Sequence, residues 1–210
     1  MNTETDGKCN VTHEEVRLPG LRIALRRPKD SESLLDENAF EHEEYLPYWA
    51  ELWPSARALE AHLTGRDLGG MRALELGCGL GLPAITAAFR GAAVLATDWS
   101  PDALRFAAAN AALNGVRLET ALCRWDEAQE VVERGPWPLV LAADVLYEQR
   151  NVDQLLPLLP RLAAPGGEVL VTDPGRVPAE RFLREAAAGW EVVTRQTGEP
   201  GVRLHVLRLP

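Results

Sequence analysis

The stretch that decides the fold is residues 71–98, MRALELGCGLGLPAITAAFRGAAVLATD. It reads as an apolar strand, a glycine-rich turn, a helix that ends at Gly91, and a second apolar strand that ends at Asp98. Glycines at such a turn allow positive φ and a close approach of a ligand, and the following helix directs its free N–H groups at that ligand. We therefore expect a βαβ unit with a binding site at the turn.

The spacing of the acidic and glycine residues indicates which class of ligand the turn binds. Asp98 follows Gly77 by 21 residues, where a carboxylate can accept hydrogen bonds from both hydroxyls of a ribose. The third glycine of a dinucleotide-binding G-x-G-x-x-G pattern would fall at position 82, which is leucine, and a glycine stands at 81 instead. This favours a nucleoside that lacks a pyrophosphate, with NAD or FAD as the alternative.

The rest of the chain extends the same pattern. Ser100-Pro101-Asp102 is typical of a helix start, and Asn114-Gly115 of a helix end. Further strands are expected over residues 117–122, 138–144 and 166–173, with helical segments between them, although Pro157 and Pro160 obscure the boundaries of one helix. The last 21 residues hold two strands joined by TGEPG, which must be antiparallel. The prediction is an α/β domain with a parallel sheet, helices on both faces and an antiparallel last strand.

Three regions are expected along the chain. Residues 1–15 read as a disordered or frayed tail, and residues 16–53 as an N-terminal hairpin, with Pro19-Gly20 at its turn, followed by an acidic arm. Residues 54–210 form the main domain, which begins with a helix at Pro54. His62 on that helix is interpreted as structural.

Composition limits the classes of function. The 210 residues are 46% hydrophobic and 25% charged, which is typical of a globular chain. The net charge is −9, of which −8 lies between Asp30 and Glu51, so no nucleic-acid partner is expected. No signal or membrane-spanning pattern is seen, and the three cysteines form no C-x-x-C pair, so we expect a cytoplasmic protein without a metal site. No membrane partner is expected, and a monomer is predicted.

Several motifs together resemble one family. The motifs that carry this resemblance are ELGCGLGLP, ATDWS, AAANAALNG, RWD and LAADVLY, with PYWAELWPSA upstream. In them the chain resembles the seven-strand S-adenosylmethionine-dependent methyltransferases of lysine methyltransferase family 16. The sequence Asp144-Val145-Leu146-Tyr147 matches the D-x-x-Y motif of that family, and Thr172 to Arg176 resembles the branch that methylates the electron transfer flavoprotein beta subunit. The resemblance implies a Rossmann-like seven-stranded sheet and S-adenosylmethionine as the cofactor, with S-adenosylhomocysteine as the product.

The resemblance also implies roles for individual residues. The turn around Cys78 would lie under the methionine part of the cofactor, Asp98 would bind the ribose, and Trp125 would contact the adenine. Cys78 itself is interpreted as a small turn residue without redox function. The expected cofactor contacts are Trp53, Glu75, Gly77, Cys78, Gly79, Gly81, Asp98, Trp99, Trp125 and Ala142.

For the acceptor, Asp144 and Tyr147 are the expected catalytic residues, because they follow the fourth strand at the sheet edge where ligands bind and can orient an amine. The competing interpretation of Asp144 is a helix cap. Glu44, Tyr48 and Trp49 are expected at the substrate entrance, where the acidic arm would attract a basic, lysine-bearing protein surface. Two alternatives stay open, a methyltransferase of a small nitrogen-containing acceptor and a cofactor-binding module without activity.

Overall fold

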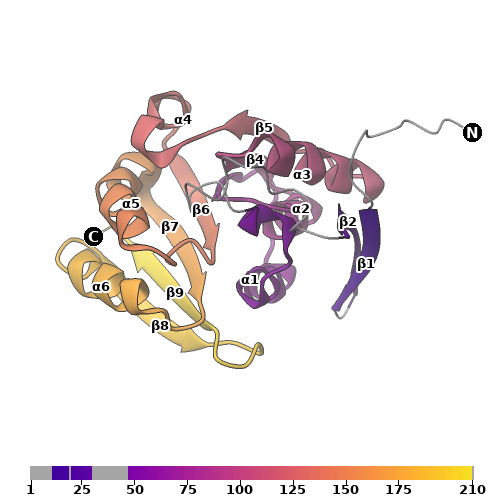
Figure 1. Cartoon of the computed structure of the whole chain (residues 1–210). Helices are drawn as coiled ribbons and strands as arrows, with labels where there is room; N and C mark the ends of the chain where they lie inside the picture. Colours follow the sequence, from indigo (N-terminus) through magenta and orange to yellow (C-terminus); the bar gives the residue numbers. More distant parts are fainter. Residues whose placement is uncertain (1–10, 19, 30–46, 210) are drawn as a thin grey trace, which may run out of the picture.

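The computed structural model describes residues 11–18, 20–29 and 47–209. At its centre is a seven-stranded sheet in the order β5-β4-β3-β6-β7-β9-β8 (Figure 1). Five strands pair in parallel, and β9 is antiparallel to both of its neighbours. This confirms the predicted fold class. The strands are β3 (Arg72–Leu76), β4 (Ala93–Asp98), β5 (Glu119–Leu122), β6 (Trp137–Ala143), β7 (Ala163–Asp173), β8 (Glu191–Gln196) and β9 (Arg203–Arg208).

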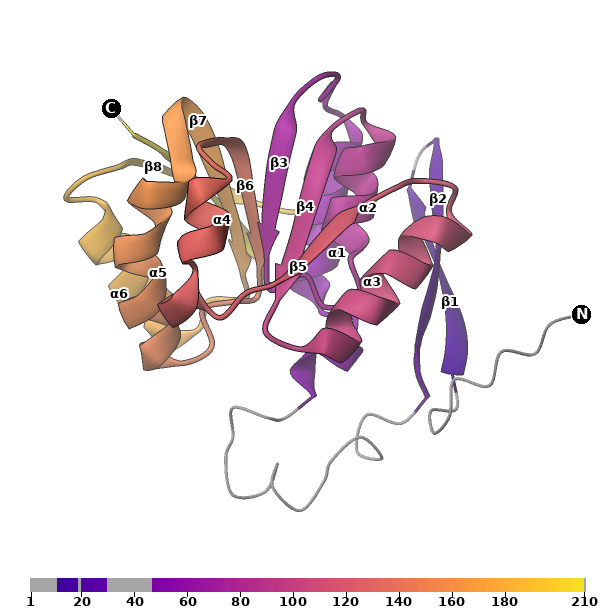
Figure 2. The same ribbon diagram turned by 90° about the horizontal axis from the view of Figure 1, so that it is seen from above.

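Helices cover both faces of the sheet, as Figure 2 shows. Alternate residues of the strands explain this, because Leu139 and Leu141 of β6 join the apolar cluster under one helical layer, while Val140 and Ala142 join the cluster under the other. One layer holds α1 (Pro54–Thr64), α2 (Leu82–Phe89) and α3 (Pro101–Leu113). The other holds α4 (Gln129–Glu133), α5 (Gln149–Leu162) and α6 (Val177–Ala186).

The helix α5 shows how two prolines can be tolerated. It runs through Pro157 and Pro160 without a break, although these residues obscured its boundaries in the sequence. Both prolines lie on the exposed side, so the carbonyl groups that lose their N–H partners can reach water. The opposite side buries an apolar row that includes Val152, Leu155 and Leu159. Burial of that row stabilises the helix despite the missing hydrogen bonds.

A separate two-stranded hairpin precedes the domain and packs beside α2 and α3 (Figure 2). It consists of β1 (Val11–Leu18) and β2 (Leu21–Pro28), with Gly20 in its turn at φ 77°. The predicted boundary of the tail was therefore wrong, because residues 11–15 pair with β2 and belong to β1. Ile23 and Leu25 are fully buried in the contact with the helices.

Two asparagines of α3 bind the edge of β2 in the manner of a neighbouring strand. Asn110 accepts from the N–H of Arg26 (2.7 Å) and donates to its carbonyl (3.1 Å). Asn114 makes the same pair of bonds with Ala24, at 2.9 and 2.7 Å. The two side chains lie one helical turn apart and meet residues two apart on the strand. They satisfy backbone groups that an edge strand would otherwise expose.

Ion pairs join the hairpin to the segment that precedes α1. The Arg27 guanidinium lies 3.2 Å from the Glu51 carboxylate and 3.4 Å from that of Glu14, which also pairs with Arg57 of α1. Glu51 follows the short helix η3 (Tyr48–Ala50). The hairpin thus helps to fix η3 against the main domain, next to the carboxyl ends of the strands.

Candidate active site

The glycine turn between β3 and α2 has the geometry that its sequence predicts. Gly77, Gly79 and Gly81 all have positive φ, at 65°, 49° and 83°. A Cβ on Gly79 would lie 3.1 Å from the carbonyl oxygen of Trp49, and one on Gly81 would lie 3.0 Å from the Cβ of Ala107. Other residues are thus disfavoured by both conformation and space. The turn is packed tightly between η3 and α3.

Two buried carboxylates stabilise this turn. Glu75 at the end of β3 accepts a hydrogen bond from the Ala84 N–H in the first turn of α2 (2.9 Å), and burial raises its pKa well above the usual value. Asp98 at the end of β4 accepts from the N–H groups of Gly79 (3.0 Å) and Ser100 (2.9 Å). Burial raises the pKa of Asp98 to about 6, against the effect of these bonds. The Trp99 N–H is a third backbone donor to this carboxylate.

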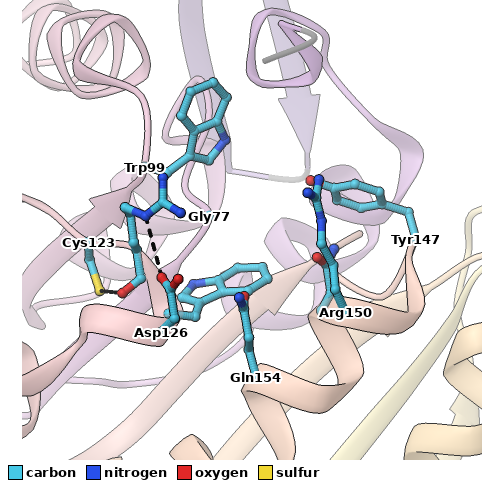
Figure 3. Close-up of a pocket in the computed structure, with 10 residues that line it drawn as sticks. Gly77, Trp99, Cys123, Asp126, Tyr147, Arg150 and Gln154 are labelled. Atoms are coloured by element: carbon cyan, nitrogen blue, oxygen red, sulfur yellow. Dashed lines mark hydrogen bonds and ion pairs between the residues drawn. The ribbon is translucent and has the colours of Figure 1, made fainter. Parts of the chain in front are cut away.

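Two adjoining cavities open at the carboxyl ends of the strands and share Gly77, Trp99, Trp125 and Tyr147 in their walls. The larger, of about 190 Å³, is shown in Figure 3. Its remaining lining is Cys123, Arg124, Asp126, Arg150, Asn151 and Gln154. The smaller, of about 90 Å³, lies on the side of η3 and the glycine turn. Its walls include Tyr48, Trp49, Trp53, Glu75, Cys78, Gly79, Asp98 and Asp144.

Asp144 is held in an unusual conformation by a closed set of hydrogen bonds. It is the one non-glycine residue with positive φ, 58°, in the described part of the chain. Its N–H donates to the Thr172 carbonyl (2.9 Å), the Thr172 hydroxyl donates to the Ser55 carbonyl (2.8 Å), and the Ser55 hydroxyl donates to Asp144 Oδ2 (3.1 Å). Arg176 Nε donates to Oδ1 (2.9 Å). A backbone outlier that neighbours hold from several sides is typical of a functional site.

Aromatic rings line the same cavity as Asp144 and form its aromatic wall. Tyr48 contacts Tyr147 and Trp53 edge to face, with ring centroids 5.5 and 6.3 Å apart. The Trp53 indole N–H donates to the Tyr48 carbonyl (2.8 Å), so its ring orientation is fixed. Burial raises the pKa of Tyr147, so its hydroxyl stays protonated and available as a donor at neutral pH. This part of the site combines an apolar wall with one oriented carboxylate.

The structure brings most of the predicted residues together. All of the expected residues apart from Gly81, Ala142 and Glu44 line one or both cavities. Gly81 serves the packing of the turn against α3, and Ala142 lies in the core, where its neighbour Ala143 lines the smaller cavity instead. Glu44 and the acidic arm from residue 30 to 46 lie outside the described residues. Cys78 is buried, and burial raises the pKa of its thiol, as expected of an unreactive turn residue.

Sequence reasoning missed two residues that contact Asp144. Ser55 stands in the first turn of α1, in the WPSA stretch that the resemblance already included. Arg176 stands at the N-cap of α6. The one sequence signal for Arg176 was its place in the TDPGR stretch. That stretch follows the carboxyl end of β7, which is the neighbour of β6 in the sheet. Nothing in the spacing indicated that either residue pairs with Asp144.

The described ranges contain neither a metal-binding cluster nor a membrane-spanning helix. No cluster of three or more His, Cys, Asp or Glu side chains in residues 11–18, 20–29 and 47–209 is arranged to hold a metal ion. In those same ranges, no helix has the length and apolar character needed to cross a bilayer.

Comparison with known proteins defines the class. The lysine methyltransferase family profile matches residues 43–187, so this chain belongs to that family. The electron transfer flavoprotein beta subunit lysine methyltransferase of Xenopus laevis is 37% identical over 152 residues, which cover 67% of this chain and 60% of the frog protein. Protein N-lysine methyltransferase METTL21A of Danio rerio is 36% identical over 125 residues, 57% of each chain. The chain thus spans a little over half the length of these relatives.

Solved structures agree on the fold. The 16S rRNA N2 G1207 methyltransferase RsmC of T. thermophilus superposes with a TM-score of 0.72 at 13% identity, covering 97% of this chain and 52% of the other. The ribosomal protein L11 methylase of Lactobacillus delbrueckii gives a TM-score of 0.60 at 23% identity, covering 74% and 78%. At such identities the likeness extends to the architecture and not to the acceptor.

Proposed function

We propose that this protein is an S-adenosylmethionine-dependent methyltransferase that acts on lysine side chains of a protein substrate. One observation carries the proposal: the oriented carboxylate of Asp144 shares one cavity with the aromatic wall and the glycine turn. The glycine turn, which suits a nucleoside cofactor, therefore lies next to a pocket that suits an amine. Family membership supports both parts.

The residues present fit the proposed cofactor. Gly77 and Gly79 line the smaller cavity, and the carboxylates at the ends of β3 and β4, Glu75 and Asp98, line it beside them. The larger cavity is walled by Trp99 and Trp125, which suit a flat purine ring. We therefore assign the adenosine part to the larger cavity and the methionine part to the smaller. When bound, the cofactor would supply a methyl group on a positively charged sulfur. A neutral amine can take up that methyl group, with S-adenosylhomocysteine as the leaving group.

The residues of the acceptor pocket would then have three tasks. Methyl transfer is an in-line displacement, so the amine must be held close to the methyl group in one orientation. Asp144 can accept a hydrogen bond from the amine and so direct its lone pair. Tyr48, Trp53 and Tyr147 exclude water, and an apolar surrounding disfavours the ammonium form, which cannot attack. The protein thus contributes orientation and desolvation.

The acidic arm gives a second element of the proposal. Reversal of Glu41, Glu43 and Glu44 to lysine should weaken transfer to a basic substrate and reduce its dependence on salt, because a negative rim speeds the encounter with a positive surface. Glu51, the last acidic residue of this run, pairs with Arg27 and lines the smaller cavity, which supports a role of the acidic residues at the entrance. Activity and salt dependence that stay unchanged would contradict this role.

The proposed compartment is the cytoplasm. Cys78 and Cys123 are both free and buried, which suits a reducing environment.

The test of the proposed function is methyl transfer to a cell lysate. Wild-type protein is incubated with radiolabelled S-adenosylmethionine, beside Asp144→Asn and the control Asp153→Asn, whose exposed carboxylate pairs with Arg181 on the surface. We expect a discrete labelled protein band with the wild type and the control that is lost with Asp144→Asn. Lysine should carry the label after hydrolysis. Label that appears in small metabolites and in no protein would assign the site to a small nitrogen-containing acceptor instead.

A further inference from the structure

Arg176 is held in place by three separate contacts. Its backbone N–H donates to Asp173 Oδ1 (2.9 Å), and its Nε donates to Asp144 Oδ1 (2.9 Å). Its guanidinium carbon lies 5.9 Å from the ring centroid of Trp53. About a third of the Arg176 side chain is exposed, whereas that of Asp144 is 6% exposed. This fixed positive charge therefore acts on the acceptor pocket through Asp144, which lines the smaller cavity.

The pocket contains more acidic than basic groups. Besides Asp144, the acidic side chains of Glu51, Glu75 and Asp98 line the smaller cavity. Asp173 at the end of β7 is close enough to sense the charge of Asp144. The titratable groups of the aromatic wall are the phenols of the half-buried Tyr147 and the exposed Tyr48. The cation that meets this group of acids at Asp144 is Arg176.

An uncompensated carboxylate would work against the proposed reaction. A negative charge within about 4–6 Å favours the protonated form of an amine and typically raises its pKa by about 1–3 units. A lysine held by a free carboxylate would therefore remain an ammonium ion, which has no lone pair for the methyl group. A carboxylate that is already paired can still accept a hydrogen bond, because each oxygen has a second lone pair.

We propose that Arg176, together with Ser55, is a positioning residue that neutralises and orients Asp144, so that the pocket takes the neutral amine in preference to the ammonium ion. Ser55 fixes Oδ2 and Arg176 fixes Oδ1, and each oxygen keeps a second lone pair that can accept from the amine. The inference rests on the proposed function and adds to it the charge state in which the acceptor is bound.

The first test measures charge preference without any catalysis. The probes are n-butylammonium, which mimics a protonated lysine side chain, and 1-butanol, its neutral counterpart. Both are titrated into protein saturated with S-adenosylhomocysteine, and binding is followed by the NMR signal of the Trp53 indole N–H. Wild type, Arg176→Gln, Arg176→Lys, Ser55→Ala and Arg184→Gln are compared. Arg184→Gln removes an exposed positive charge from α6 and is the matched control.

We expect Arg176→Gln to raise the preference for the cation about tenfold, because Asp144 loses its counter-charge. Arg176→Lys and Arg184→Gln should behave like the wild type, and Ser55→Ala should change in the same direction by a smaller factor. If Arg176 had a purely structural role, Arg176→Gln would weaken the binding of both probes by the same factor. Equal ratios in Arg176→Gln and Arg184→Gln, or a gain in Arg176→Lys as large as in Arg176→Gln, would overturn the proposal.

The second test uses the methyl acceptor found in the lysate. The acid limb of its kcat profile, which reports groups in the enzyme–substrate complex, should move upward by about one pH unit in Arg176→Gln and return in Arg176→Lys. An acid limb that stays in place in Arg176→Gln would overturn the proposal. If the wild type transferred no methyl group, the proposed function would fail, while the probe ratios would still decide whether Arg176 sets the charge preference of the pocket.

Discussion

The two halves of the site are built in different ways. The cofactor half comes mainly from one continuous stretch, residues 75–100, and is stabilised largely by backbone groups that bind Glu75 and Asp98. The acceptor half is assembled from side chains of separate segments, namely Tyr48, Trp53, Ser55, Asp144, Tyr147 and Arg176. The first half depends on conformation and the second on a network of side chains. Each should therefore fail separately when it is disturbed.

The largest effect is expected in the cofactor half. Gly79→Val should weaken binding of S-adenosylhomocysteine about 100-fold, because a side chain at φ 49° is strained and its Cβ would meet the Trp49 carbonyl at 3.1 Å. Calorimetric titration measures the affinity. Gly198→Val is the control, since no atom lies within 4 Å of its added Cβ. Equal affinities in the two variants would show that the turn does not hold the cofactor.

The next effect separates the acceptor half. Asp144→Asn should lower methyl transfer about 100-fold, since the amine loses its charged hydrogen-bond acceptor, and should change the affinity for S-adenosylhomocysteine less than about twofold. Asparagine is chosen because it tolerates the positive φ of this position better than alanine does. Transfer rates and calorimetry on the same preparations measure both quantities. A parallel loss of cofactor affinity would mean that the two halves are not separate.

A smaller effect tests the connection between the hairpin and the glycine turn. Asn110→Ala and Asn114→Ala should each lower the free energy of unfolding by about 1–2 kcal/mol, because each leaves backbone groups of β2 without partners. Asn110 also donates to the Leu80 carbonyl in the turn, at 3.0 Å. Only Asn110→Ala should therefore also lower the affinity for S-adenosylhomocysteine, by a few-fold. Denaturant unfolding and calorimetry distinguish the pair, and equal cofactor affinities would contradict the link.

The smallest effect concerns α1, which carries Ser55 at its start and Glu60 further along. Burial raises the pKa of Glu60 from 4.5 to about 7, and neither carboxylate oxygen has a hydrogen-bond partner among the described residues. The folded protein thus binds more protons than the unfolded chain between pH 4.5 and 7, so its stability falls as pH rises through that window. Glu60→Gln should raise the free energy of unfolding at pH 8 by about 1–2 kcal/mol.

The same substitution should have little effect near pH 4.5, where the carboxyl group is protonated in the folded protein and still about half protonated in the unfolded chain. Denaturant unfolding at the two pH values measures this difference, with the exposed Glu180→Gln as the control. Methyl transfer should be unchanged, because Glu60 contacts neither half of the site. A stability gain that is equal at both pH values would indicate packing and not the buried charge as its cause.

The contrast between the halves also explains what could be predicted from sequence. The glycine turn, Asp98, and the helix from Pro101 to Asn114 follow local rules of conformation and capping, and the structure confirms their placement. Pairing of Asp144 with Ser55 and Arg176 joins residues 89 and 32 positions away. No local propensity encodes such contacts, so only the folded arrangement of β6, β7 and α1 reveals them. The early start of β1 was missed for a similar reason, since its polar residues form a strand through pairing with β2.

The most direct test of the account measures two quantities on three proteins: affinity for S-adenosylhomocysteine by calorimetry, and transfer of labelled methyl groups to lysine in a lysate protein. The proteins are the wild type, Gly79→Val and Asp144→Asn. We predict that Gly79→Val loses both, and that Asp144→Asn keeps the affinity and loses the transfer. Transfer that persists in Asp144→Asn, or an affinity that falls equally in both variants, would contradict a site made of a cofactor half and a separate acceptor half.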